Sequence, residues 1–86
     1  MATLDERFEE AQTKVQTLPK RPANETLLEL YALYKQGSAG DVQGSRPGMF
    51  DLKGRAKYDA WAARRGTGRE AAKEAYVALA ERVLAG

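Results

Sequence analysis

The 86-residue sequence contains no cysteine and no histidine. Without cysteine, the chain cannot form disulfides or thiolate metal sites. Without histidine, it lacks the commonest general base, the usual partner of a catalytic serine and the commonest metal ligand. Catalysis would have to rest on carboxylates, lysines or tyrosines. These absences leave little catalytic or metal-binding chemistry open to the chain, and we expect no catalytic residues and no metal site.

Long apolar runs are also missing. The first ten residues hold no apolar stretch of the length that a signal peptide requires, and no segment approaches the roughly 18 apolar residues of a membrane span. We therefore expect a cytoplasmic protein without stable membrane insertion. Runs of alternating β-branched residues are absent as well, which argues against a β-sheet.

The residues that are present form the composition of a small globular domain, with 43% hydrophobic and 30% charged residues. A chain of this length holds one hydrophobic core, so we expect a single domain over residues 1–86 and a monomer. The net charge is only +2, but acidic residues dominate the first 29 positions and basic residues dominate positions 53–69. Such an uneven distribution indicates an anionic partner that is met locally.

Apolar residues recur at helical spacing in four segments of the chain. The first segment opens at Thr3 and Glu6, which match a capping box, and it ends before Pro19. The second begins with Asn24 as its N-cap and ends near Gly37. Each segment carries its apolar residues on one stripe, as expected of a helix that packs against a core.

The second half of the chain holds a long loop and two further helical segments. Residues 38–50 are rich in glycine, serine and proline and show no periodicity, so they read as a loop. Residues 53–65 form a shorter, weaker helical pattern, and a second capping box at Thr67 and Glu70 opens the last one. Four amphipathic helices bury their stripes only against each other. The predicted fold is an all-α four-helix bundle.

One helical face gathers groups that can bind an anion. Tyr31, Tyr34 and Lys35 stand at positions i, i+3 and i+4 of the second segment, which places two phenols and an ammonium group on adjoining surface. Aromatic faces stack on nucleobases, and lysine binds phosphate. Lys57 of the third segment is a second candidate for the same anion. Spacing alone leaves two alternatives open, since the tyrosines can be core packing and the lysine can simply solubilise its helix.

Taken together, these stretches resemble the acyl-CoA-binding protein family. The likeness extends from Phe8 to Val83, and the order and spacing of the motifs agree with the family pattern. The matching pieces are Leu30-Tyr31-Ala32-Leu33-Tyr34-Lys35-Gln36, Gly40-Asp41, Arg46-Pro47-Gly48-Met49, Asp51-Leu52-Lys53-Gly54-Arg55-Ala56-Lys57-Tyr58-Asp59-Ala60-Trp61 and Ala75-Tyr76.

The resemblance implies a four-helix bundle in an up-down-down-up arrangement that binds one fatty acyl-CoA in a bowl on its surface. Proteins of this family are carriers and not enzymes, and they need no cofactor. The implied function is reversible, non-catalytic binding of medium- to long-chain acyl-CoA esters, as an intracellular carrier that also forms a pool of them.

The resemblance also implies a role for each residue of the headgroup site. Tyr34 is similar to the residue that stacks on the adenine ring, and Lys35 and Lys57 resemble the pair that contacts the 3′-phosphate of the ribose. Tyr31 resembles a phenol hydrogen-bonded near that phosphate, and Tyr76 resembles the tyrosine of the fourth helix that closes the site.

The acyl path is less clearly marked, and it falls on Ala11, Leu27 and Leu28. The sequence also departs from the family pattern. Gln16 stands where a basic ligand contact is common, so we expect one phosphate or carbonyl contact to be missing. Gln12 replaces a small residue of the first helix. Two further departures are Tyr58 in place of tryptophan and Gly37-Ser38 in place of Ala-Thr, and Gly37 is expected to fray the end of its helix.

Three other functions compete with this one. A thioesterase acting on the same ligand would need Asp41 or Asp51 as its base, and neither has an evident nucleophilic partner. A nucleic-acid-binding module is suggested by the basic third quarter with Tyr58 and Trp61. A helical module that binds a protein partner is the third alternative.

Overall fold

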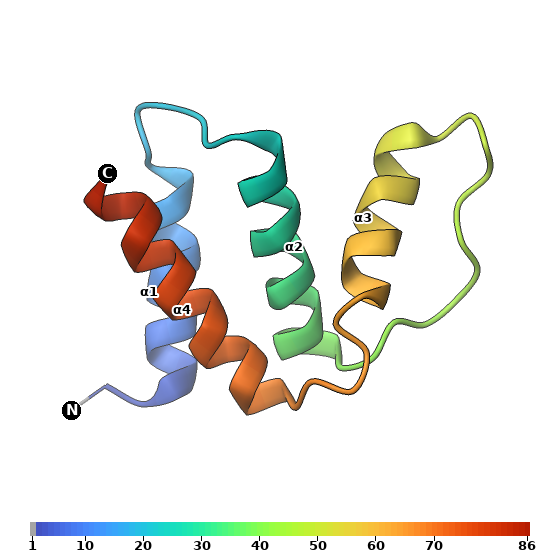
Figure 1. Ribbon diagram of the computed structural model, residues 1–86. Helices are drawn as coiled ribbons and strands as arrows, with labels where there is room; N and C mark the ends of the chain where they lie inside the picture. Colours follow the sequence, from blue (N-terminus) through green and yellow to red (C-terminus); the bar gives the residue numbers. More distant parts are fainter. Residues whose placement is uncertain (1) are drawn as a thin grey trace.

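The computed structural model describes residues 2–86, which contain four α-helices and no strand. Figure 1 shows the first helix running up, the next two running down and the last running up again, as predicted for this bundle. The helices are α1 (Leu4–Gln16), α2 (Asn24–Ala39), α3 (Leu52–Ala62) and α4 (Arg69–Ala85).

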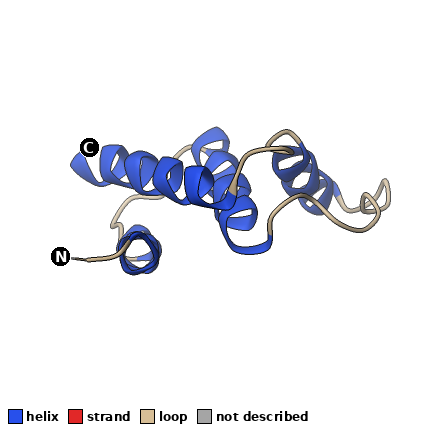
Figure 2. Cartoon of the chain, turned by 90° about the horizontal axis from the view of Figure 1, so that it is seen from below, coloured by secondary structure: helices blue, strands red, loops and turns tan. Residues whose placement is uncertain are grey.

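The helices do not pack evenly around a common axis. α4 packs against both α1 and α2, whereas α3 packs against α2 alone. Figure 2 shows α3 set apart at one end of the molecule, with the 40–51 loop looping beyond it. α2 is therefore the only helix in contact with α3, and any site between α3 and the rest of the bundle must include it.

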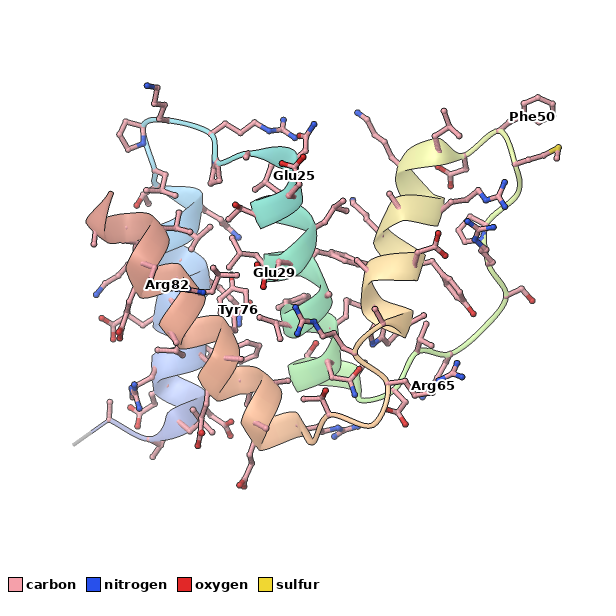
Figure 3. All side chains as sticks on the ribbon, viewed as in Figure 1. Glu25, Glu29, Phe50, Arg65, Tyr76 and Arg82 are labelled. Carbon is pink, nitrogen blue, oxygen red and sulfur yellow. The ribbon has the colours of Figure 1, made fainter. Side chains whose placement is uncertain are left out.

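The largest part of the core lies where α1, α2 and α4 meet. Phe8 and Ala11 from α1, Leu30 and Leu33 from α2 and a stripe of α4 make up this cluster. Figure 3 shows Tyr76 of α4 in the space between α4 and α2. The predicted stripes of α1 and α4 are confirmed, although Val77, which lies beside the α4 stripe, is also buried.

Burial on α2 is wider than a single stripe. Leu33 is 3% exposed, Ala32 is 1% exposed and Gln36 is completely buried. None of them lies on the face that helical spacing predicts to be apolar, which consists of Leu27, Leu30, Tyr31 and Tyr34. The reason is that α2 has α4 on one side and α3 on the other. Helical periodicity indicates one buried face, so it misses a helix that packs on two.

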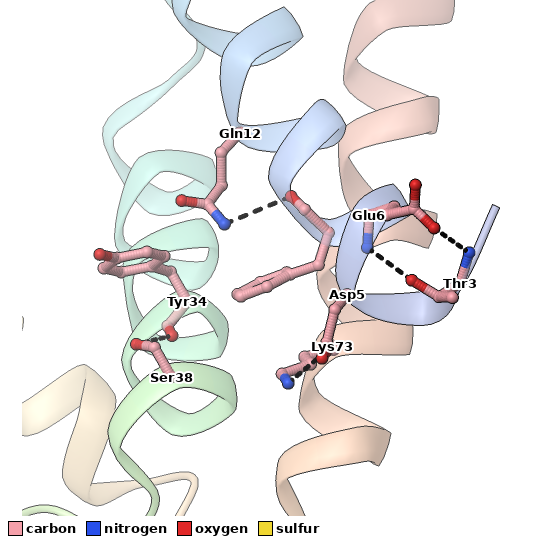
Figure 4. A network of polar contacts seen from close by, with 8 residues as sticks. Thr3, Asp5, Glu6, Gln12, Tyr34, Ser38 and Lys73 are labelled. Atoms are coloured by element: carbon pink, nitrogen blue, oxygen red, sulfur yellow. Dashed lines mark hydrogen bonds and ion pairs between the residues drawn. The ribbon is translucent and has the colours of Figure 1, made fainter.

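The capping box at the start of α1 is present as predicted. The Glu6 N–H donates to the Thr3 hydroxyl at 3.1 Å, and the Thr3 N–H donates to the Glu6 carboxylate at 3.0 Å, as Figure 4 shows. These two bonds satisfy N–H groups that a helix start otherwise leaves without partners. They fix the entry of the chain into the bundle.

Two other predicted caps are wrong. α4 begins at Arg69, and its N-cap is Gly68, which makes no side-chain cap bond. Thr67 does not cap the helix, because its carbonyl accepts a hydrogen bond from Gln36 of α2. Asn24 is the first residue of α2, and its cap is Ala23.

The ends of α2 and α3 also differ from the predictions. Gly37 does not fray α2, because it is buried inside the helix and the helix continues to Ala39. Gly40 ends it with a φ of 85°, a conformation that suits glycine. α3 ends at Ala62, three residues before the predicted end, and a turn leads to Gly66 at φ 89°. Residues 63–68 therefore form a linker that turns back toward α2.

Candidate functional site

The residues singled out on α2 lie on an accessible surface of that helix. Tyr34 is 38% exposed, and Tyr31 and Lys35 are half-buried. Their spacing of three and four positions places them side by side along the helix. Half-buried aromatic rings present a face to solvent, which is the geometry needed to stack on a planar ligand.

A groove of about 390 Å³ runs beside this surface, between α2 and the facing parts of α1 and α4. It contains three of the predicted headgroup tyrosines and one predicted acyl-path residue. Its lining residues are Gln12, Val15, Gln16, Leu27, Leu30, Tyr31, Tyr34 and Tyr76. The groove therefore joins a phenol-rich end to an apolar end.

The ring of Phe8 packs against the rings of two of these tyrosines. Its ring lies 6.1 Å from the Tyr34 ring at an interplanar angle of 25°, and it meets the Tyr76 ring edge-on at 5.2 Å and 84°. These offset and edge arrangements are the favourable ones for aromatic pairs. Tyr76 is only 5% exposed, and burial raises the pKa of its phenol, so it remains a neutral hydrogen-bonding group at physiological pH.

The two lysines predicted to bind phosphate lie where α3 packs against α2. The Lys35 Nζ lies 4.8 Å from the centroid of the Trp61 ring, and the Lys57 Nζ lies 5.4 Å from that of Tyr31. Each lysine thus crosses from one helix to an aromatic ring of the other. The structure brings Lys35 and Lys57 to the same α2–α3 seam.

Both ammonium groups keep their charge available. None of the ion pairs formed among residues 2–86 involves Lys35 or Lys57. A cation over an aromatic face is attracted by about 0.5 to 2 kcal/mol, less than it gains from a phosphate at close range. The arrangement can therefore hold the lysines at the seam without neutralising them.

A second groove, of about 560 Å³, continues the first one toward the loop that joins α1 to α2. The two grooves share Val15, Gln16 and Leu27. The second is lined further by Leu18, Pro19 and Pro22, with Lys20 and Arg21 at its edge. An extended apolar chain can lie along this continuous path.

The other two acyl-path candidates lie elsewhere. Ala11 is 6% exposed and faces a separate groove between α1 and α4, together with Val77 and Ala80. Leu28 is half-buried and lines none of these grooves. Val15, by contrast, lies in both grooves and was not among the candidates, although its place on the α1 stripe was the available signal.

Three comparisons with known proteins bear on this site. A family model described as acyl CoA binding protein matches residues 5–80. The chain is 50% identical over 78 residues to an acyl-CoA-binding protein homolog of Caenorhabditis elegans, a match that covers 91% of each chain. It is 48% identical over 84 residues to an acyl-CoA-binding protein homolog of Manduca sexta, covering 96% of this chain and 93% of the relative.

A solved structure agrees with these relatives. The crystal structure of acyl-CoA-binding protein 2 of Oryza sativa superposes with a TM-score of 0.91 at 45% identity, covering 95% of this chain and 89% of that one. The chain belongs to the acyl-CoA-binding protein family. This is a family of binding proteins, and the relatives named here give no support to a nucleic-acid-binding module.

Gln12 and Gln16, two departures from the acyl-CoA-binding protein pattern, both line the first groove. The Gln12 Nε2 donates to the Phe8 carbonyl at 3.3 Å, as Figure 4 shows. Gln16 is exposed where the two grooves join and carries no charge. The middle of the path is therefore neutral in this member of the family.

Gln36, at the end of the family motif on α2, has a role that spacing did not reveal. Its Nε2 donates to the Asp41 carboxylate and to the Thr67 carbonyl, both at 2.8 Å. Asp41 also accepts the Gly66 N–H at 2.9 Å, and these bonds lower the pKa of its carboxyl group. The Gln36 amide thus ties both α3 connections to α2, which positions α3 for the seam.

The long loop is fastened to α3 by side chains of the family motifs. Arg46 pairs with both carboxylate oxygens of Asp59 at 2.9 and 2.7 Å, and the Trp61 indole N–H donates to the Gly40 carbonyl at 2.8 Å. Tyr58, which replaces the common tryptophan, donates its hydroxyl to the Gly44 carbonyl at 3.0 Å. The departure at Tyr58 therefore supplies a loop contact.

The carboxylates considered as catalytic bases are already engaged. Asp41 accepts hydrogen bonds that favour its ionised form, and Asp51 accepts the Gly54 N–H at the start of α3. Within residues 2–86, no group of three or more acidic side chains converges so as to hold a metal ion. Among the helices that the structure describes, none is long and apolar enough to span a membrane.

Proposed function

We propose that this protein binds medium- to long-chain fatty acyl-CoA esters reversibly and without chemistry, as a monomeric cytoplasmic carrier that needs no cofactor. The single observation that carries the proposal is the junction at α2. Tyr31 lies in the groove with Tyr34 and Tyr76, and it also lies under Lys57 at the α2–α3 seam. Stacking groups, cations and an apolar path thus meet at one helix.

The headgroup is assigned to the α2 surface on physical grounds. Tyr34 presents its exposed ring to the adenine, since base–aromatic stacking is worth about 1 to 3 kcal/mol. Lys35 and Lys57 approach the 3′-phosphate, because a hydrogen bond to a charged group contributes about 1.5 to 3 kcal/mol. Tyr31 and Tyr76 supply phenols beside them. A free fatty acid lacks both the base and the phosphate.

The acyl tail is assigned to the continuous path past Leu27 and Val15 toward the 17–23 loop. A buried methylene contributes about 0.8 kcal/mol, so ten shielded methylenes contribute roughly 8 kcal/mol before ordering costs are subtracted. Chain length should therefore tune affinity strongly. Ala11 and Leu28 stay weaker candidates, and any part they play would require the tail to leave the two grooves.

The proposal of binding without turnover is supported by the residues at hand. The chain has no cysteine or histidine, and the two carboxylates considered as bases, Asp41 and Asp51, are engaged as hydrogen-bond acceptors. Incubation with palmitoyl-CoA should release no free thiol above the rate without protein. Steady thiol release that scales with protein concentration would show a thioesterase instead.

Parallel calorimetric titrations test the binding function. Palmitoyl-CoA should bind tightly, whereas free coenzyme A and palmitate should each bind at least about a hundredfold more weakly, because each makes only one half of the contacts. Equal affinity for palmitoyl-CoA and palmitate would contradict a headgroup site. Tight, salt-sensitive binding of an oligonucleotide with no response to palmitoyl-CoA would favour the nucleic-acid alternative.

A further inference from the structure

Three large apolar side chains project into solvent at the start of α3. Phe50 is 98% exposed, Leu52 is 73% exposed and Met49 is 70% exposed. We call these three residues the apolar tip. Figure 3 shows Phe50 pointing away from the four helices. A single exposed apolar residue is ordinary, but three within four positions form a patch that needs an explanation.

The tip is held in its exposed position by backbone contacts. The Asp51 N–H donates to the Gly48 carbonyl at 3.0 Å, which closes a turn around Met49 and Phe50. The Asp51 carboxylate then accepts the Gly54 N–H at 3.0 Å and caps α3. The Asp51 side chain thus bonds to the start of α3, while the apolar side chains on both sides of it face outward.

The tip lies at the same end of the molecule as the open end of the acyl path. The up-down-down-up arrangement places the end of α1 and the starts of α2 and α3 together, as Figure 1 shows. The second groove is lined by the 17–23 loop at that end. A surface that receives the tip also faces this groove.

Charge at this end favours an anionic surface. Lys20 and Arg21 on the 17–23 loop and Lys53 beside the tip are all exposed. The carboxylates at the same end include those of Glu25 and Asp51, and that of Asp51 is engaged in capping α3. Exposed cations around projecting apolar side chains suit the headgroup region of an anionic bilayer, where each cation near the surface adds attraction.

We propose that the apolar tip inserts reversibly into the headgroup boundary of anionic phospholipid membranes and brings the open end of the acyl path to the bilayer surface. A protein partner is a poorer match for this shape. One aromatic side chain buries about 150 to 250 Å², so three projecting side chains fall short of the roughly 800 Å² that each partner buries in a standard interface. The orientation of the groove rests on the proposed function, whereas insertion of the tip does not.

Vesicle flotation of the ligand-free protein tests the insertion. The probes are phosphatidylcholine vesicles with and without about one quarter phosphatidylserine, at low and at physiological salt. The wild type should float with the anionic vesicles and much less with the neutral ones. Phe50→Ser should lower the partition coefficient about tenfold, the effect expected for losing one aromatic group from the interface. Lys53→Gln should lower it severalfold at low salt.

Matched controls separate the tip from general apolarity and charge. Leu84→Ser removes a partly exposed apolar side chain of α4, and Arg65→Gln removes an exposed cation at the opposite end, where Figure 3 labels Arg65. Both should float like the wild type. A wild type that ignores anionic vesicles, or a Phe50→Ser variant that floats equally well, would overturn the proposal.

Calorimetry without vesicles distinguishes the tip from the ligand site. Phe50→Ser should bind palmitoyl-CoA within about twofold of the wild type, since Phe50 lines neither groove. If this variant lost acyl-CoA affinity as strongly as vesicle binding, the tip would belong to the ligand site and the proposal would fail. Loss of acyl-CoA binding by the wild type alone, with flotation intact, would refute the proposed function and leave the insertion standing.

Discussion

Lys35 and Lys57 belong to different helices, yet each contacts an aromatic ring of the other helix. A lysine that only solubilises its helix extends into water, whereas these ammonium groups lie 4.8 Å and 5.4 Å from ring centroids across the α2–α3 seam. The geometry favours the ligand interpretation over the solubilising one. The contacts depend on two side chains from each helix.

Replacing either lysine should weaken binding without unfolding the protein. Lys35→Ala and Lys57→Ala each remove one of the two proposed phosphate contacts, and a loss of about 1.5 to 3 kcal/mol corresponds to roughly a tenfold to hundredfold rise in Kd for palmitoyl-CoA. Calorimetry measures the Kd, and the urea midpoint should stay close to that of the wild type.

The matched control is Lys14→Ala, which removes an exposed lysine of α1 that pairs with Glu10 at 2.7 Å. It should leave the Kd unchanged. A 3′-dephospho acyl-CoA ester provides the complementary test, because the wild type should bind it as weakly as the lysine variants bind the normal ester. Tight binding of the dephospho ester by the wild type would show that the lysines do not contact this phosphate.

Replacing Gln36 should lower the stability of the protein. The side chain is completely buried, and its Nε2 donates to both Asp41 and Thr67. Gln36→Leu keeps the volume but leaves the Thr67 carbonyl without this donor, at a cost of about 1 to 3 kcal/mol. In a domain of this size that lowers Tm by roughly 4 to 8 °C per kcal/mol.

Thermal unfolding followed by circular dichroism measures this shift. Gln43→Leu, at an exposed position of the 40–51 loop, is the control and should leave Tm nearly unchanged. Equal Tm values for Gln36→Leu and the wild type would mean that the linker is held to α2 by other contacts.

At the scale of helices, the close approach of α4 to α2 depends on Gly37. A Cβ added there would lie 3.0 Å from the Lys73 Cγ and 3.3 Å from the Phe8 Cζ. Phe8 cannot move freely, because its ring is packed against Tyr34 and Tyr76. The glycine that the sequence marks as a weak point is therefore a packing contact.

Gly37→Ala should destabilise the protein despite the higher helix propensity of alanine. The substitution gains up to about 1 kcal/mol in propensity and loses about 1 to 3 kcal/mol to overpacking, so the free energy of unfolding should fall by up to about 2 kcal/mol. Urea denaturation measures it. Gly48→Ala, where an added Cβ meets nothing within 4 Å, should be neutral. A more stable Gly37→Ala variant would show that Lys73 and Phe8 yield at little cost.

The helices themselves were predictable because each carries an apolar stripe, and the capping box at Thr3 fixed one start correctly. The start of α4 was not, because Thr67 uses its carbonyl in a contact with Gln36 that lies 31 positions away in sequence. The spacing of residues along one segment indicates only the bonds formed within that segment. The wide burial of α2, at Leu33 inside the core cluster and at Gln36 outside it, was missed for the same reason, since α2 packs against both α4 and α3.

The candidate site was predictable only in part. Spacing alone placed Tyr31, Tyr34 and Lys35 on one surface, but it did not decide between binding and packing. Lys57 was a second candidate on its own segment, and the resemblance to a family added Tyr76; the structure now places all five around α2. Ala11 lies in a different groove because its side of α1 faces α4.

The whole molecule is a thin slab, 43 × 29 × 15 Å in extent, in which α3 is an outlying element. α1, α2 and α4 share one core, whereas α3 contributes a single buried residue, Trp61, and packs against α2 alone. Segments with few buried apolar contacts open locally at a lower free-energy cost than the core does. The seam that holds Lys35 and Lys57 is therefore the least stable interface of the bundle, and a ligand that bridges it should stabilise α3 most.

Amide hydrogen exchange tests this expectation at the scale of the whole chain. In the free protein, α3 amides should exchange faster than those of α4. At palmitoyl-CoA concentrations about a hundredfold above Kd, α3 exchange should slow by up to about a hundredfold, because a ligand that binds only the closed form stabilises it by about 2.7 kcal/mol. Lys57→Ala, measured at the same absolute ligand concentration, should lose much of this protection while the other helices change little. Exchange of α3 as slow as that of α4 without ligand would contradict the picture, because α3 would then open only with the core.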